Sequence, residues 1–371
     1  MTPRERLRAA LEHREPDRVP IDIGGSYATG INIVAYEALK RHLGLESETV
    51  VASRRSQIAM VEEDIRRRLA IDTYPLFPRA PEGSEVIYPD GSYRDEWGVL
   101  RRKPEGGHYY VVEAPLAGEI SLADLSSFPW PDAHDPGYLR GLAEEDRKAR
   151  QETDYALILS LPVGFVHQSQ FMRGYEAWLM DLVLEPSRAE ALMDHILEIH
   201  LAIIGRMLEA VEGDVDVVLY ADDVAFQDRL MVSPELYGRL IKPRQQRLMQ
   251  FIKAKTRAKI LYHTCGAVYP LIGDFIEIGV DILNPIQTTA HGMDIRRIKG
   301  KFGGDLCFWG GIDTQHLLPH GSPQEVASAT QEVIACLGQG GGYVLSAANN
   351  IQADVPPQNI LAMIDAARSV S

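Results

Sequence analysis

Residues 215–220 (VDVVLY), 233–254 (SPELYGRLIKPRQQRLMQFIKA) and 259–263 (KILYH) form an apolar run, a helical pattern and a second apolar run. Short apolar runs rich in Val, Ile, Leu and Tyr are typical of buried strands, and Ser-Pro-Glu is a common helix start. A strand, a helix and a second strand in this order predict a parallel β-α-β unit.

The same alternation extends along most of the chain, with each apolar run bounded by Gly, Pro, Asp or Asn. The eight predicted strands are residues 19–23, 73–77, 155–161, 215–220, 259–263, 281–285, 306–310 and 343–346. Ser or Thr caps predict helix starts at Thr2, Ser187, Ser233 and Ser322. Eight such strands with intervening helices predict an α/β fold of the distorted (β/α)8, or TIM, barrel type.

Residues 85–119 interrupt this alternation. Within them, Pro89-Asp90-Gly91 and Glu105-Gly106-Gly107 separate three strand-like pieces, and turn residues at this spacing favour antiparallel pairing. We therefore expect an antiparallel excursion inserted after the second strand of a single barrel domain that takes in residues 1–371.

Composition and charge exclude several classes of protein. The chain has 38 Lys and Arg against 52 Asp and Glu, a formal net charge of −14, so we expect no nucleic acid partner. It has no run of about 18 apolar residues and no apolar signal segment near the N-terminus, so we expect no membrane span. Its three widely spaced cysteines favour a reducing compartment over a disulfide scaffold, which predicts a cytoplasmic protein.

Barrel enzymes carry their sites at the carboxyl ends of the strands, so polar residues that follow an apolar run are the candidates. His167 begins the helix after the third strand and is included with them. The candidates are His167, Asp222, Asp223, His263, Cys265, Asn284, Gln287, Gly311, Asp313, Asn349 and Gln352.

His263-Thr264-Cys265 is the most specific of these patterns. Residues two apart on an extended strand end point the same way, so the imidazole and the thiol converge and can bind one zinc ion. The alternative is a His–Cys pair that only packs or hydrogen-bonds. One of Asp222 and Asp223 is expected to face inward as a substrate ligand, an acid or base, or an orienting group for His263, whereas the other caps a loop.

Several motifs occur in an order that resembles the uroporphyrinogen decarboxylase superfamily. They are Arg18-Val19-Pro20, His263-Thr264-Cys265-Gly266, Phe308-Trp309-Gly310-Gly311-Ile312-Asp313 and Asn350-Ile351-Gln352 with Val355-Pro356-Pro357. The resemblance implies a distorted (β/α)8 barrel. It also implies one of two activities, cofactor-free decarboxylation of porphyrinogens or zinc-dependent methyl transfer with corrinoid proteins.

The two branches differ in their motifs. The decarboxylases resemble one another in an Arg-Gln-Ala-Gly-Arg segment near the first strand, but residues 24–30 of this chain contain no arginine. The methyltransferase branch resembles this chain in His263-x-Cys265, which implies two zinc ligands, and usually has a third cysteine after the last strand. Asn349 stands in that neighbourhood, which leaves three alternatives: zinc binds weakly, zinc takes a ligand from elsewhere such as Asp222, or zinc is absent.

These patterns predict a corrinoid-linked methyltransferase that moves a methyl group between a small methylated substrate and a separate corrinoid protein. His263 and Cys265 would hold zinc, Asp222 would act beside them, and the other candidates would contact substrate. A homodimer is compatible with the sequence. The alternatives are a metal-free lyase that acts on a non-porphyrin carboxylate and a non-catalytic barrel that binds a small molecule.

Overall fold

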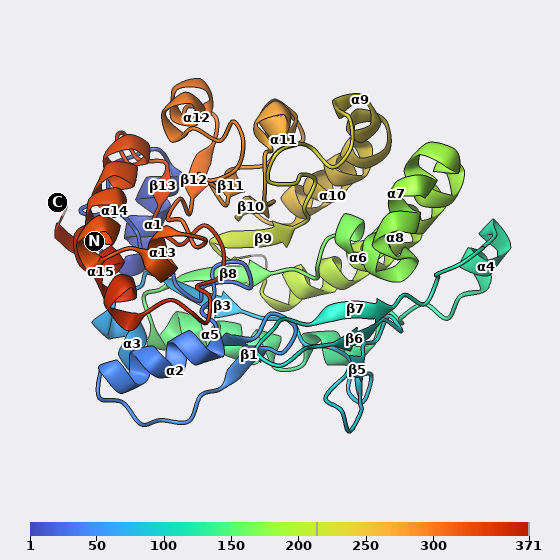
Figure 1. Cartoon of the computed structure of the whole chain (residues 1–371), viewed down its shortest axis with the longest axis horizontal. Helices are drawn as coiled ribbons and strands as arrows, with labels where there is room; N and C mark the ends of the chain where they lie inside the picture. The colour runs from blue at the N-terminus through green and yellow to red at the C-terminus, as the bar shows by residue number, and fades with distance from the viewer. Residues whose placement is uncertain (213, 370–371) are drawn as a thin grey trace.

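The computed structural model describes residues 1–212 and 214–369. Its central element is a curled parallel sheet of seven strands in the order β13-β12-β11-β10-β9-β8-β3 (Figure 1). The strands are β3 (Thr73–Leu76), β8 (Ala156–Ser160), β9 (Val217–Ala221), β10 (Lys259–His263), β11 (Ile282–Asn284), β12 (Cys307–Trp309) and β13 (Tyr343–Val344). Seven of the eight predicted strands and the barrel fold class are thus confirmed.

The eighth predicted strand, residues 19–23, is reduced to a single parallel bridge between Ile21 and Leu345. The Leu345 N–H donates to the Pro20 carbonyl at 2.9 Å, and the Asp72 N–H donates to the Ile21 carbonyl at 2.8 Å. The Ile21 N–H donates to the Asp72 carboxylate instead of to a backbone carbonyl, and Pro20 has no N–H to donate. The prediction of a full strand is wrong for this reason, although the segment still closes the barrel between β13 and β3.

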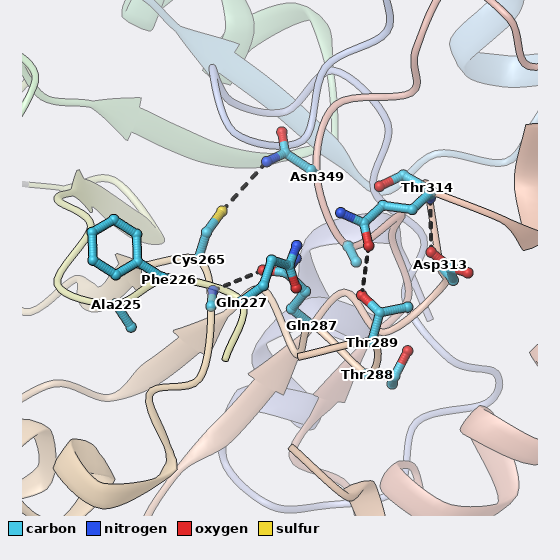
Figure 2. A pocket seen from close by; sticks show the side chains of 13 residues that line it. Ala225, Phe226, Gln227, Cys265, Gln287, Thr288, Thr289, Asp313, Thr314 and Asn349 are labelled. Atoms are coloured by element: carbon cyan, nitrogen blue, oxygen red, sulfur yellow. Dashed lines mark hydrogen bonds between the residues drawn. The ribbon is translucent and has the colours of Figure 1, made fainter. Parts of the chain in front are cut away.

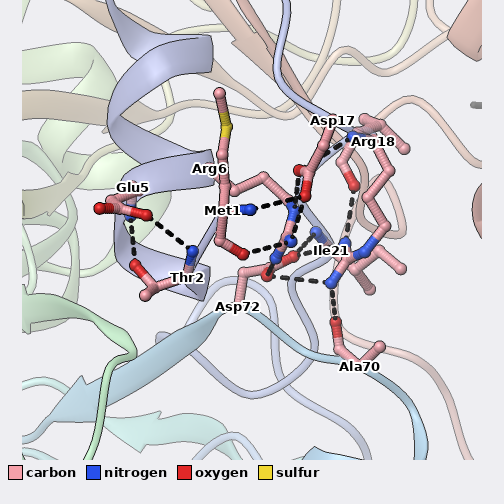
Figure 3. Close-up of polar contacts among 10 residues, drawn as sticks. Met1, Thr2, Glu5, Arg6, Asp17, Arg18, Ile21, Ala70 and Asp72 are labelled. Atoms are coloured by element: carbon pink, nitrogen blue, oxygen red, sulfur yellow. Dashed lines mark hydrogen bonds and ion pairs between the residues drawn. The ribbon is translucent and has the colours of Figure 1, made fainter.

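A buried charge network stabilises this closure (Figure 3). The Asp72 carboxylate is fully buried and accepts from Arg6 at 2.6 Å and from Arg18 at 2.7 Å. Arg6 lies on α1 (Pro3–Leu11) and also contacts Asp17 at 2.6 Å. A buried carboxylate is tolerated when cations and N–H groups satisfy it, so this network joins α1, the closing segment and β3.

Helix α1 also covers the amino-terminal end of the barrel, where it contacts β8 and β13. Its Leu7 and Leu11 join the apolar side chains that fill the barrel interior, and this gives a packed core in place of a channel. The interior side chains include Ala156, Ile158, Val217, Leu219, Leu261, Ile282, Cys307, Trp309 and Val344.

The remaining helices surround the sheet (Figure 1). The longer ones are α2 (Ile33–His42), α5 (Leu142–Glu152), α6 (Phe165–Arg173), α7 (Tyr175–Leu184), α8 (Pro186–Ala210), α10 (Lys242–Lys255), α12 (Ile295–Phe302), α14 (Pro323–Leu337) and α15 (Pro357–Ser369). The shorter ones are α3 (Glu63–Arg68), α4 (Leu122–Ser127), η1 (Pro136–Leu139), α9 (Pro234–Leu236), η2 (Tyr237–Ile241), η3 (Tyr269–Leu271), α11 (Ile272–Glu277) and α13 (Leu317–His320).

The predicted helix starts are mostly confirmed. The side chains of Thr2, Ser233 and Ser322 cap α1, α9 and α14. Ser187 is the exception, because α8 already begins at Pro186 and Ser187 lies inside its first turn. A proline is favoured in the first turn of a helix, and here it sets the helix start ahead of the serine.

The antiparallel excursion follows β3 as expected and contains four strands instead of three, in the order β4-β5-β6-β7. These are β4 (Val86–Ile87), β5 (Tyr93–Arg94), β6 (Leu100–Arg102) and β7 (Tyr110–Glu113). A separate hairpin, β1 (Val51–Ser53) with β2 (Ile58–Ala59), precedes them. None of the helices in residues 1–212 and 214–369 has the length and apolar character needed to cross a bilayer.

Candidate functional site

The register of neighbouring strands brings the main candidates together at the carboxyl end of the barrel. His263, at the end of β10, is level with Ala221 at the end of β9 and with Asn284 at the end of β11. Residues that follow β9 and β10 therefore meet at one edge of the sheet. This edge carries Asp223 and Cys265.

Asp223, His263 and Cys265 form a compact cluster. One ligand atom from each, a carboxylate oxygen, an imidazole nitrogen and the thiol sulfur, lie within 4.8 Å of one another. The Cys265 Sγ lies 3.5 Å from the His263 Nε2, and the Cys265 backbone N–H donates to the Asp223 Oδ1 at 2.7 Å. The cluster therefore offers three donors that face a common point.

The orientation of His263 follows from its partner. The Asn284 Nδ2 donates to the Trp309 carbonyl at 3.1 Å, which leaves the Asn284 Oδ1 as an acceptor 2.6 Å from the His263 Nδ1. The proton of a neutral imidazole is therefore placed on Nδ1, and the lone pair of Nε2 points toward Cys265. Burial also lowers the pKa of His263, which favours this neutral form.

The two adjacent carboxylates have different surroundings. Asp222 is fully buried, and its oxygens accept from the Val166 N–H at 3.0 Å, from the His167 N–H at 2.7 Å and from the Tyr220 hydroxyl. Burial raises the pKa of Asp222 to about 6. The start of α6 thus holds Asp222 away from the cluster, and the extra donor beside His263 and Cys265 is Asp223 instead of the expected Asp222.

Asp223 is the more acidic of the pair. Burial opposes its ionisation, but the hydrogen bond and charge of His167, followed by the charge of His263, lower its pKa to about 2. The His167 Nε2 lies 3.5 Å from the Asp223 Oδ2, and the His167 Nδ1 lies 3.4 Å from Asp222. Burial alone would lower the pKa of His167. The hydrogen bond to Asp223 and the negative charge of the two carboxylates outweigh this effect, so the pKa of His167 is raised. The His167 imidazole therefore lies between the two carboxylates, which favour its protonated form.

The Cys265 thiol faces an open cavity of about 340 Å³ (Figure 2). The Asn349 Nδ2 donates to the Cys265 Sγ at 3.4 Å, and the Gln287 Oε1 accepts from the Gly266 N–H at 2.7 Å. Burial raises the pKa of Cys265 well above its usual value, so the metal-free thiol stays protonated. A bound cation would offset this cost, because a thiol that coordinates a metal is deprotonated.

Other predicted site residues lie apart from the cluster. Asp313 lines the cavity, but its carboxylate accepts from the backbone N–H groups of residues 315–317. Gly311 is outside the cavity lining, and a Cβ built at this position would lie 3.1 Å from the Val333 Cγ1. Gln352 contacts His108 at 3.1 Å and is also outside that lining.

Sequence reasoning missed several residues of the cavity wall. Phe226, Gln227, Thr289 and Gln315 come from the loops after three strands. The Thr289 hydroxyl donates to the Gln315 side chain at 2.9 Å across the wall. These residues lie several positions beyond the strand ends, in loops whose course the apolar pattern of the strands does not determine.

The donor set fits a zinc ion. Zinc binds nitrogen, sulfur and carboxylate oxygen, and a catalytic zinc takes three protein ligands and leaves one position open. The Nε2 lone pair, the thiol and the low-pKa carboxylate supply one donor of each kind. The arrangement can therefore hold a divalent metal at the edge of a cavity of small-ligand size.

Comparison with known proteins gives three findings. The family model described as uroporphyrinogen decarboxylase matches residues 121–370. A curated uroporphyrinogen decarboxylase of Pseudoalteromonas atlantica is 29% identical over 79 residues, and this match covers 21% of the chain and only 22% of that relative. A solved methyltransferase from Methanosarcina mazei has a TM-score of 0.70 at 17% identity, over 99% of this chain and 98% of that one. At this identity the likeness establishes the fold.

Proposed function

The chain belongs to the uroporphyrinogen decarboxylase family, and from that premise we propose that it is a zinc-assisted methyltransferase of the family. In this proposal it moves a methyl group between a small methylated substrate and a corrinoid held by a separate protein. The observation that carries the proposal is the convergence of Asp223, His263 and Cys265 beside the cavity. A structural neighbour that is itself a methyltransferase supports the same reading.

Asp223, His263 and Cys265 would hold the metal, with His263 oriented by Asn284. When bound, zinc supplies a Lewis acid that polarises the substrate atom bearing the methyl group. His167 keeps a proton at Nε2 beside Asp223 and so stabilises the carboxylate in its ionised form. The protein residues thus present a deprotonated oxygen and a neutral imidazole to the metal.

The cavity favours a small substrate of low charge. Gln287 and Asn349 present amide groups to it, and residues 24–30, where the porphyrinogen decarboxylases carry arginines, contain none. Its volume of about 340 Å³ suits a small molecule. We therefore propose that the corrinoid is presented at the barrel mouth by a partner protein.

Three free cysteines agree with the reducing, cytoplasmic location that we also propose.

The test is the metal content of the purified full chain, followed by methyl transfer to a reduced corrinoid. We expect about one zinc per chain in the wild type and almost none in the His263→Ala, Cys265→Ala double variant. Cys307→Ala is the matched control. It removes a thiol that is 2% exposed and lies at the amino-terminal end of β12, whereas the cluster lies at the carboxyl ends of the strands. Failure of the wild type to bind supplied zinc would refute the zinc proposal and favour a metal-free lyase.

A further inference from the structure

A second cavity of about 240 Å³ lies apart from the metal cluster and shares no lining residue with the cavity described above. Its floor is formed by residues that follow β3 and β8 and by Leu219 and Ala221 of β9. The opposite wall comes from the segment that holds the antiparallel sheet and includes Trp97 and Arg101. This cavity is therefore formed where the antiparallel excursion covers the barrel mouth.

Three buried polar groups in the wall of this cavity have no hydrogen-bond partner among residues 1–212 and 214–369. They are the Tyr138 hydroxyl, the Gln168 Nε2 and the His200 Nε2. Their residues are 4%, 2% and 2% exposed. These three atoms have almost no accessible surface, so they lie behind the cavity surface and do not themselves face a ligand.

The cavity also contains uncompensated positive charge. Arg55 and Arg79 line it, and neither forms an ion pair with a carboxylate of the described residues. Arg101 differs, because its guanidinium lies 3.1 Å from the Asp95 carboxylate. The second Asp95 oxygen accepts from the backbone N–H groups of residues 97 and 99. Asp95 is therefore already satisfied, whereas Arg55 and Arg79 remain available to an anion.

The other acidic groups in the wall oppose an anion only weakly. Glu85 lies 3.7 Å from Arg54, which offsets its charge. Burial, and then the neighbouring charge of Asp95, raises the pKa of Glu96 to about 7. This shift reduces the negative charge that Glu96 carries at neutral pH. The available donors are the guanidinium groups of Arg55 and Arg79, which match the acceptors of a carboxylate.

The remaining wall is apolar and partly aromatic. Trp97, Tyr27, Pro78, Leu161 and Val163 contribute to it. We propose that this cavity binds a small organic carboxylate whose flat apolar body packs against these side chains while Arg55 binds the carboxylate. The proposal goes beyond the methyltransferase proposal and does not depend on metal binding.

Isothermal titration calorimetry of the full chain with benzoate tests this proposal. Benzamide has the same shape without the charge, and we expect it to bind at least about tenfold more weakly, as for the loss of a charge-assisted hydrogen bond. Arg55→Gln should weaken benzoate binding by about tenfold or more. Arg229→Gln is the matched control, because that arginine is 75% exposed, lies outside this cavity and should leave affinity unchanged.

Arg79→Gln provides a second variant that should fold normally, because this arginine is exposed and has no ion pair among the described residues. We expect an unchanged melting temperature together with benzoate binding that is several-fold weaker. Equal affinity for benzoate and benzamide, tighter binding of inorganic phosphate than of benzoate, or no benzoate binding at millimolar concentration would overturn the proposal.

The same titration separates this site from the metal centre. The His263→Ala, Cys265→Ala double variant should bind benzoate like the wild type, with or without added zinc. Loss of benzoate binding in that variant would place the carboxylate at the metal cluster and overturn a separate site. Zinc binding by Arg55→Gln should match the wild type, so failure of either proposal is recognised independently of the other.

Discussion

Replacing Asn284 with leucine should weaken zinc binding without removing any of the three donor groups. His263 and Asn284 are 8% and 1% exposed, so water does not readily replace the Asn284 Oδ1 that lies 2.6 Å from the His263 Nδ1. In Asn284→Leu, the buried Nδ1–H has no acceptor, which costs about 1 to 3 kcal/mol. If the proton moves to Nε2, the lone pair that would bind zinc is lost.

Either response raises the dissociation constant for zinc. Loss of a group that orients a metal-binding histidine typically weakens affinity by about 10- to 100-fold. The measurement is a competition between the protein and a chromogenic chelator of known zinc affinity, with circular dichroism to establish that the variant is folded. Asn284→Asp is the control, since a carboxylate still accepts from Nδ1 and should keep affinity within about threefold of the wild type, well inside that range. Wild-type affinity in Asn284→Leu, or an equal loss in both variants, would refute the reasoning.

Three further predictions concern stability. Asp72→Ala should lower the free energy of unfolding by about 3 to 5 kcal/mol in urea denaturation, because Arg6 loses the buried carboxylate that lies 2.6 Å from it; a loss below about 1 kcal/mol, the usual value of a surface pair, would contradict the role of the network. Gly164→Ala should lower the melting temperature, because the new Cβ would lie 2.2 Å from the Asp222 Cγ, and an unchanged melting temperature would count against the tight packing of that loop. Burial raises the pKa of Glu96 from 4.5 to about 7, so its ionisation in the folded state destabilises the protein as pH rises through this interval. Glu96→Gln should therefore be more stable than the wild type by about 3 kcal/mol at pH 8 and equal to it at pH 4, and a difference that does not depend on pH would exclude this cause.

The strands of the barrel could be predicted because parallel strands are buried on both faces and read as continuous apolar runs. The segment at residues 19–23 reads the same way. Its single bridge depends on Asp72, whose side chain takes the Ile21 N–H from about fifty positions away. Local pattern carries no information about such a partner, so the closing segment could be located but its pairing could not.

The pairing of His263 with Cys265 in the candidate site could be predicted from the sequence. His263 and Cys265 converge because they are two residues apart at one strand end. The choice between Asp222 and Asp223 depends on the N–H groups at the start of α6, which capture Asp222. Gly311 was expected near the ligand, but it lies outside the cavity lining, and a Cβ at its position would lie 3.1 Å from the Val333 Cγ1.

The carboxylate cavity could not be predicted for a related reason. Its wall combines residues that follow the barrel strands with residues of the inserted antiparallel sheet. The sequence shows that the insertion exists, but its position over the barrel mouth results from long-range packing, such as Arg101 over the Phe171 ring at 4.3 Å. Sites formed between an insertion and its host fold are therefore found from the structure.

The closing bridge between Ile21 and Leu345 also affects how the protein can fold during synthesis. The Gly30 N–H donates to the Asn350 side chain across 320 residues, so residues 20–30 leave the ribosome long before the segment that completes their pairing. Until then β3 and the buried Asp72 lack a neighbour on one side, and contacts of such long sequence separation form late. Closure of the barrel therefore waits until residues 345–351 have been synthesised, and the open edge of β3 has to be protected from aggregation until then.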